Sequence, residues 1–236
     1  MGKRWCDNMI FKNIHEKSIL PKIFVATAIL GAIVVSGNLM FADADKLLPL
    51  FKPYKVNGDP VRNFLVLACM SIYFLRLLAT LFVFFQRKLY WGEAIVVANI
   101  MPWIFPYVAY KSGDYTGIIG WMELLGIILF LTGSYLNTAS EYFRFAWKKK
   151  RENTGHLYTG GLFKYTRHTN YFGDIVLFAG LAAVAHQVQL LIIPAAMASF
   201  FIMVIIPLKE NYLKENYGDE YVSYAANTKR LIPFIF

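Results

Sequence analysis

Six long apolar stretches constrain this chain more than any other feature of its sequence. They cover roughly residues 22–41, 63–85, 93–110, 117–140, 171–186 and 188–207. A helix of about 20 apolar residues is long enough to cross the hydrocarbon core of a bilayer. Only His186 and Gln187 separate the last two stretches, which predicts a tight helical hairpin. The expected fold is an all-α, polytopic transmembrane helical bundle of about six to seven spans.

The overall composition supports this interpretation. Of the 236 residues, 57% are hydrophobic and only 17% are charged, which is too apolar for an ordinary soluble domain. The chain is also too long to be a single membrane anchor. It is therefore expected to be an integral, multi-pass membrane protein.

The distribution of Lys and Arg predicts the orientation, because cytosolic loops carry an excess of basic residues. Segments 1–22, 86–92, 141–170 and 208–236 hold most of the 24 Lys and Arg residues, whereas the opposite loop 42–62, which ends at Arg62, holds few. Both termini are thus predicted to be cytosolic. The net charge of +9 follows from this bias and from attraction to anionic lipid headgroups, so no nucleic-acid partner is expected.

Ionisable residues within or beside membrane spans are costly and point to function. Tyr73 and Arg76 are three residues apart and share one helical face, so a phenol and a cation can be presented to one ligand. The structural alternative is that Tyr73 packs with its hydroxyl satisfied and Arg76 reaches a headgroup.

Two amide–carboxylate pairs face the same predicted cytosolic loop. Asn137 and Glu141 close one span, and Asn170 and Asp174 open another, each pair being one helical turn apart. The structural alternatives are a Glu141–Arg144 ion pair and a favourable carboxylate in the first turns of a helix. Two such pairs together favour a ligand rich in hydroxyl and amide groups.

A basic run lies in the loop between these pairs, at Lys148, Lys149, Lys150 and Arg151. Cations of this kind bind phosphates, so a nucleotide cofactor would satisfy both the amide–carboxylate pairs and the basic run. The histidines and cysteines have no zinc-ligand spacing, and no metal is expected. The phosphate-binding motifs of soluble nucleotide-binding folds are absent from the sequence.

Two segments carry a resemblance to a known family. "GGLFKYTRHTNYFGD" (160–174) and "ENYLKENYGDEYVSYAANTKRLIPFIF" (210–236) resemble the C-terminal domain of the steroid 5α-reductase family and its bacterial relatives. The resemblance covers residues 70–236 of a single membrane domain, 1–236, and residues 1–62 with the first span are poorly matched. It implies a helical bundle that binds NADPH from the cytosolic side and reduces the carbon–carbon double bond of a lipid-soluble enone, typically a 3-oxo-Δ4-steroid. The membrane would be the endoplasmic reticulum in a eukaryote or the inner membrane in a bacterium.

The resemblance also assigns roles to residues. Tyr73 and Arg76 would be catalytic. The cofactor-binding residues would be Asn137, Glu141, Tyr142, Lys148, Asn170, Asp174 and Tyr212. An acid that partners the tyrosine in the animal enzymes has no counterpart in the first span, since its place falls near Leu39 and the nearest carboxylates are Asp43 and Asp45.

Two alternatives remain open. Isoprenylcysteine carboxyl methyltransferases, which use S-adenosylmethionine, share a similar C-terminal core with an "RHPxY" motif, in which Thr169 of this chain replaces the proline. A non-catalytic sterol- or lipid-binding relative would keep the fold without the reaction. The physiological substrate and the oligomeric state do not follow from the sequence.

Overall fold

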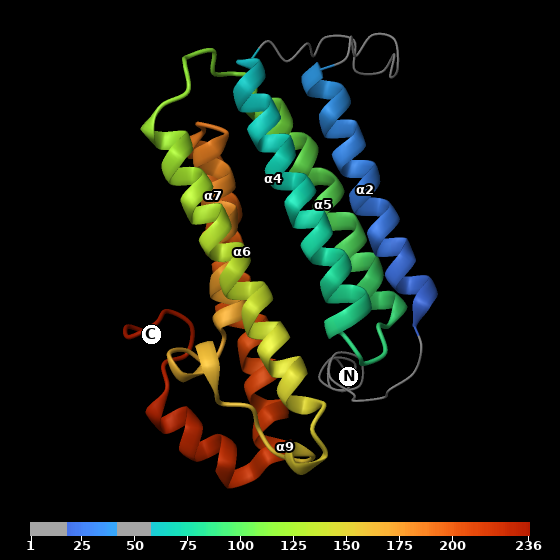
Figure 1. Ribbon diagram of the computed structural model, residues 1–236, viewed down its shortest axis with the longest axis vertical. Helices are drawn as coiled ribbons and strands as arrows, with labels where there is room; N and C mark the ends of the chain where they lie inside the picture. Colours follow the sequence, from blue (N-terminus) through green and yellow to red (C-terminus); the bar gives the residue numbers. More distant parts are fainter. Residues whose placement is uncertain (1–17, 42–57) are drawn as a thin grey trace. The chain divides into compact units, whose positions relative to one another are not determined.

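A computed structural model describes residues 18–41 and 58–236, and over these ranges the chain is helical. Within these ranges, one isolated β-bridge pairs the backbone at Thr166 with that at Lys229. The all-α prediction is confirmed for the described residues (Figure 1). Asp43 and Asp45, considered above as the missing acid, lie outside the described residues.

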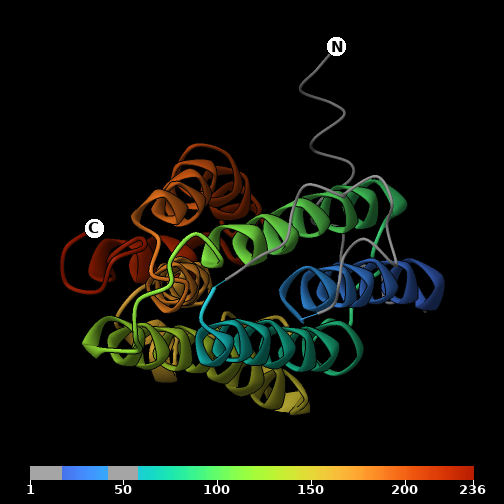
Figure 2. The same cartoon turned by 90° about the horizontal axis from the view of Figure 1, so that it is seen from above.

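The helices form two compact units. The first contains α2 (Ile19–Phe41), α4 (Pro60–Ala79), the π-helical turn Thr80–Phe84 and α5 (Trp91–Ser112). In this unit α2 packs along α5 and α4, and the three helices lie side by side in both views (Figures 1 and 2). The same unit includes residues up to Ile128 and the segment Gly180–Leu191.

The second unit comprises Leu129–Ala179 and Ile192–Phe236. Its elements are most of α6 (Trp121–Lys148) and α7 (Thr169–Val184), together with α8 (Ile192–Phe200), the π-helical turn Phe201–Ile205 and α9 (Ile206–Asn227). Two short 3-10 helices, Arg151–Asn153 and Gly161–Lys164, lie in the loop between α6 and α7. A third, Val188–Leu191, precedes α8.

Glycines bring α6 and α7 into close contact in the second unit. A Cβ atom on Gly133 would lie 2.4 Å from the carbonyl oxygen of Gly173 and 2.4 Å from the amide nitrogen of Leu177. No side chain can occupy that space without moving backbone, and small residues at such an interface let two membrane helices approach closely. The two backbones are therefore near enough for short polar side chains to bridge them.

Near its middle, α9 changes direction. Gly218 has φ 50°, a left-handed conformation that glycine adopts without strain. Beyond this kink the Tyr224 hydroxyl donates to the Phe163 carbonyl oxygen at 2.6 Å, and Glu220 accepts from the Leu157 amide at 3.1 Å. The second half of α9 thus supports the loop that leads into α7.

Each of the six predicted apolar stretches contains a helix in the structure, although α6 begins only at Trp121 and α7 ends at Val184. Within residues 18–41 and 58–236, five helices are long and apolar enough to cross a membrane: Ile19–Phe41, Pro60–Phe84, Trp91–Ser112, Trp121–Lys148 and Val188–Asn227. The remaining one, α7, is apolar but has 16 residues. The predicted hairpin is confirmed, with His186 at φ 53° in the turn. The protein is an integral membrane protein, whereas the cytosolic placement of its termini and its single-domain organisation stay predictions.

Candidate functional site

Hydrogen bonds join three of the predicted site residues across α6 and α7. The Asn137 side-chain amide donates to the Asn170 carbonyl oxygen at 3.0 Å. The Asn170 side-chain amide in turn donates to Glu141 Oε1 at 3.0 Å. One complete amide–carboxylate pair of the sequence, Asn137 and Glu141, and the amide of the other, Asn170, therefore meet at one interface, which we call the α6–α7 seam.

The structural alternative for Glu141 is present as well. Arg144 forms an ion pair with Glu141 Oε2, so the two carboxylate oxygens have different partners, an amide and a guanidinium. The Glu141 side chain is largely buried and that of Arg144 is about one-third exposed. A charge-assisted arrangement of this kind fixes the carboxylate in one orientation.

Thr138 follows Asn137 on α6, and its hydroxyl is a further polar group there. It is buried and has no hydrogen-bond partner among the described residues. Buried hydroxyls are normally hydrogen-bonded. Thr138 therefore has hydrogen-bonding capacity left on α6, at the residue that follows Asn137.

The structure places the other predicted cofactor residues on the same helices or on α9. Asp174 lies one turn beyond Asn170 on α7 and is partly buried. Tyr142 is exposed on α6, and Tyr212 lies on α9 with the Lys209 ammonium 5.8 Å from its ring centroid. Their roles in cofactor binding stay predictions.

The basic run begins where α6 ends and is exposed to solvent. The Lys148 ammonium donates to the Tyr217 hydroxyl of α9 at 2.8 Å, while Lys150 lies 3.9 Å from Glu152. Lys149 and Arg151 are also exposed. These are weak, solvent-screened contacts, so a phosphate group can compete with them.

Tyr73 and Arg76 of α4 belong to the first unit. As their spacing predicts, they share a face, and the Arg76 guanidinium carbon lies 5.0 Å from the centroid of the Tyr73 ring. The same ring meets Phe105 of α5 edge-on, at 5.4 Å and 85°. Tyr73 is therefore a buried residue whose ring contacts an arginine and a second aromatic ring.

The sequence analysis missed an acidic centre in the second unit. Glu210, one turn into α9, forms ion pairs with Arg167 and Arg230, both at 2.9 Å. Its Oε1 atom also lies 3.4 Å from His168 Nε2. Burial lowers the pKa of His168, and the hydrogen bond to Glu210 opposes that effect in part. The signal was available, because Glu210 is the first carboxylate after the last apolar stretch and the segment 160–174 contains both Arg167 and His168.

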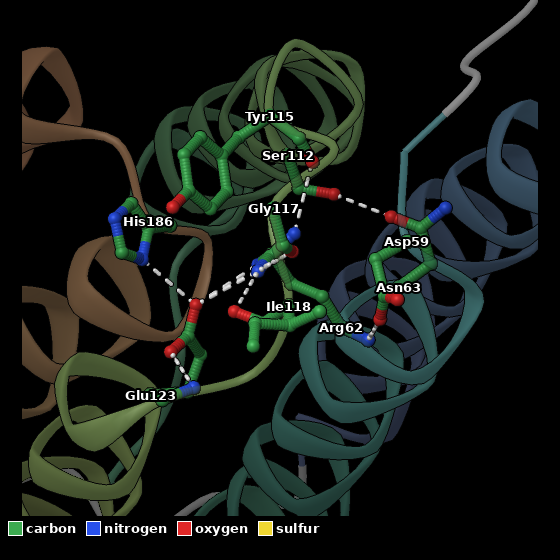
Figure 3. A network of polar contacts seen from close by, with 10 residues as sticks. Asp59, Arg62, Asn63, Ser112, Tyr115, Gly117, Ile118, Glu123 and His186 are labelled. Carbon is green, nitrogen blue, oxygen red and sulfur yellow. Dashed lines mark hydrogen bonds and ion pairs between the residues drawn. The ribbon is translucent and has the colours of Figure 1, made fainter.

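A second missed group lies in the first unit, where Arg62 of α4 pairs with Glu123 of α6 (Figure 3). The Arg62 Nε and Nη2 atoms donate to Glu123 Oε1 at 3.1 and 3.0 Å, and both side chains are 0% exposed. The assignment of Arg62 to a loop was wrong: α4 begins at Pro60, capped by Asp59, and carries Arg62 in its first turn. Glu123 is an ionisable residue inside a predicted span, and the rule applied to Arg76 would have identified it.

The remaining contacts of this ion pair complete its hydrogen bonding. Arg62 also donates to the carbonyl oxygens of Tyr115 and Gly117 at 2.9 and 2.7 Å. His186 Nδ1 lies 2.8 Å from Glu123 Oε1, and its ring stacks on Tyr115 at 3.9 Å (Figure 3). The network ties the start of α4, the loop before α6 and the turn after α7 together, which is a structural role.

Comparison with known proteins decides the family. The family model described as "Protein of unknown function (DUF1295)" matches residues 50–228. The chain belongs to this family. It is 32% identical over 127 residues to 3-oxo-5-alpha-steroid 4-dehydrogenase 2 of Macaca fascicularis and 31% identical over 127 residues to that of Homo sapiens, covering 54% of this chain and 47% of each relative. These matches confirm the resemblance to the steroid 5α-reductase family.

A relative of the alternative class is also similar. The DUF1295 chain is 28% identical over 120 residues to Protein-S-isoprenylcysteine O-methyltransferase B of Arabidopsis thaliana, covering 49% of the chain and 61% of that protein. The chain spans about half the length of the steroid dehydrogenases it matches. The similarity therefore shows the family, and the activity has to be argued from the residues of the site.

Proposed function

We propose that this protein is a membrane-embedded, NADPH-dependent reductase of the carbon–carbon double bond of an enone lipid resembling a 3-oxo-Δ4-steroid. The observation that carries the proposal is the Asn137–Asn170–Glu141 cluster, which brings the Asn137–Glu141 pair and Asn170 together at one seam. The similarity to steroid 4-dehydrogenases over half the chain supports the same reaction class.

The residues at the seam fit a nicotinamide nucleotide. Glu141 and the amide side chains can accept and donate hydrogen bonds to ribose hydroxyls and a carboxamide, and the buried Thr138 hydroxyl has capacity to spare. Asp174 lies on the α7 face one turn from Asn170. We assign Tyr142 and Tyr212 to the same cofactor, and Lys148 to its phosphates, with the rest of the basic run.

Bound NADPH would supply a hydride, and the protein has to orient the substrate and stabilise the charge that develops on its ketone oxygen. Tyr73 is the proposed proton donor to that oxygen. Its buried position between Arg76 and Phe105 suits this role, because a preorganised donor in a water-poor site stabilises developing charge without having to reorient. Arg76, over the face of the ring, holds the phenol in place.

The substrate should be dissolved in the bilayer, because the spans of this protein are apolar and the reacting group must reach buried side chains. The test is reconstitution in nanodiscs with a panel of steroid, polyprenyl and fatty enones, following oxidation of the nicotinamide together with the mass of the lipid product. We expect enone-dependent oxidation and a product heavier by two hydrogens. NADPH binding without oxidation across the panel would favour the non-catalytic lipid-binding alternative.

The basic run is proposed to set the preference for NADPH over NADH through the additional phosphate. Replacing Lys148 and Arg151 with alanine should reduce this preference, whereas Lys214→Ala, an exposed lysine on α9, should leave it unchanged. If the preference is the same in both variants and the wild type, the basic run serves only as a topology signal.

Methyl transfer from S-adenosylmethionine is the second candidate, and the similarity to the Arabidopsis methyltransferase favours it. At the position of the motif proline, Thr169 donates to the carbonyl oxygens of Leu162 and Thr166, both at 3.1 Å. These bonds connect the start of α7 to the preceding turn, and a proline at this position could not form them because it has no hydroxyl. Transfer of a labelled methyl group to a prenylcysteine carboxylate would establish this alternative.

A further inference from the structure

Residues 232–236 form a compact loop with large apolar side chains on its outside. The backbone amides of Leu231 and Ile232 donate to the backbone oxygen of Phe236 at 2.6 and 2.7 Å, and these two bonds close the loop. Phe234 is 76% exposed and Ile235 is 74% exposed. Phe234 has φ 65°, a left-handed conformation that is strained for a non-glycine residue. The fold therefore accepts strain at a residue whose ring is exposed.

An apolar pocket of about 250 Å³ lies beneath this loop. Phe172 of α7 and Tyr165 line it, and Pro233 and Phe234 of the loop close one side. The Tyr165 and Phe234 rings are 5.8 Å apart, and Tyr165 is itself 52% exposed. Pockets for drug-sized ligands usually have about 300–1,000 Å³, so this one is suited to part of a flexible chain rather than to a whole sterol.

Two lysines flank the loop and the pocket. Lys164 precedes the lining residue Tyr165, and the Lys229 backbone pairs with the Thr166 segment, its carbonyl oxygen accepting from the Arg167 amide at 2.8 Å. Both lysines are exposed, and no carboxylate in the described part of the chain forms an ion pair with either. Positive charge thus lies beside an exposed apolar surface.

We propose that the 232–236 loop lies at the bilayer surface and binds an anionic phospholipid, with part of an acyl chain in the pocket beneath Phe234 and the headgroup between Lys164 and Lys229. Aromatic side chains are favoured at the membrane–water interface. Lysines near an anionic leaflet add electrostatic attraction. In this position the bilayer shields the apolar loop from water. Burial of the Phe234 ring in lipid would then offset the backbone strain at this residue.

Fluorescence quenching in single-copy nanodiscs tests the location of the loop. A Phe234→Cys variant in a Cys6→Ser background can be labelled selectively, because the remaining Cys69 is buried. Asn216→Cys, exposed in a polar stretch of α9, is the matched control. We expect brominated acyl chains to quench the label at 234 and aqueous iodide to quench the label at 216. Iodide quenching at 234, or protection at 234 only when a second copy is present, would overturn the proposal.

Lipid binding tests the role of the lysines. Each basic residue near an anionic surface contributes about 1 kcal/mol, or about fivefold in affinity, so Lys164→Gln/Lys229→Gln should weaken retention of phosphatidylglycerol about 25-fold. The control Lys214→Gln removes the charge of an exposed lysine of α9 that lies outside the basic run, and it should leave retention unchanged. Equal loss in both variants, or equal retention of phosphatidylcholine and phosphatidylglycerol by the wild type, would refute a specific site. This result does not depend on which reaction the protein catalyses.

Discussion

Asn170 donates from its side-chain amide to Glu141 at 3.0 Å, while its backbone carbonyl accepts from Asn137 at 3.0 Å. One residue of α7 thus contacts two residues of α6 that are one turn apart. The arrangement depends on Gly133 and Gly173, which allow the two helices to approach closely enough for these short side chains to meet.

The first prediction concerns that close approach. Gly133→Ala should destabilise the protein by about 1–3 kcal/mol, the usual cost of overpacking, and should also weaken NADPH binding because α6 and α7 would separate. Gly31→Ala in α2 is the matched control, since a Cβ there meets nothing within 4 Å. Thermal unfolding and cofactor titration in detergent measure both effects. Equal stability of the two variants would show that the seam tolerates a wider separation.

The second prediction concerns the proposed proton donor. Tyr73→Phe keeps the ring that packs on Phe105 and Arg76 and removes only the hydroxyl. Turnover should fall about 100- to 1000-fold, while NADPH should stabilise the variant as much as the wild type. Steady-state kinetics together with thermal shifts separate the two effects. Unchanged turnover would remove Tyr73 from the mechanism.

The third prediction concerns the buried ion pair. Glu123→Ala leaves the Arg62 charge uncompensated in a site with no exposure, which should cost about 3–5 kcal/mol. Lys150→Ala breaks the solvent-exposed pair with Glu152 and should cost about 0.2–1 kcal/mol. Denaturant unfolding in mixed micelles compares the two. The double variant Arg62→Met/Glu123→Leu should recover most of the loss, and failure to do so would show that the remaining contacts of Arg62 matter more than the charge pair.

The fourth prediction concerns pH. Because the folded state lowers the pKa of His168, the unfolded state binds more protons below about pH 6.5. The contribution of His168 to the free energy of unfolding should therefore be fully present above that pH. It should fall as the pH decreases further. His168→Gln should reduce this slope, whereas His156→Gln, which replaces an exposed histidine, should not. A slope unaffected by His168→Gln would assign the acid sensitivity to other groups.

Much of the fold follows from periodicity and length. The six apolar stretches predict the positions of the helices, since a helix in a membrane must be both apolar and about 20 residues long. The His186 turn follows from the short polar interruption between two stretches. Spacing also predicts the Tyr73–Arg76 contact, because it lies within one helix.

The sequence alone does not reveal contacts between distant segments. Arg62 and Glu123 are 61 residues apart, and Arg62 was assigned to a loop because the start of α4 is set by the Asp59 cap and Pro60 rather than by apolar residues. Glu210 meets Arg230 only because α9 turns back at Gly218. Such pairings depend on tertiary structure, which local patterns do not encode.

The most direct test of the central claim is the thermal stability of the purified protein with NADPH, NADH and S-adenosylmethionine, in the wild type, in Asp174→Asn and in the exposed control Asp219→Asn. At 100 times its dissociation constant a ligand should stabilise the folded state by about 2.7 kcal/mol. The account predicts stabilisation by NADPH in the wild type and in Asp219→Asn, and a loss of that effect in Asp174→Asn. Stabilisation by S-adenosylmethionine alone, or by NADPH equally in all three proteins, would contradict it.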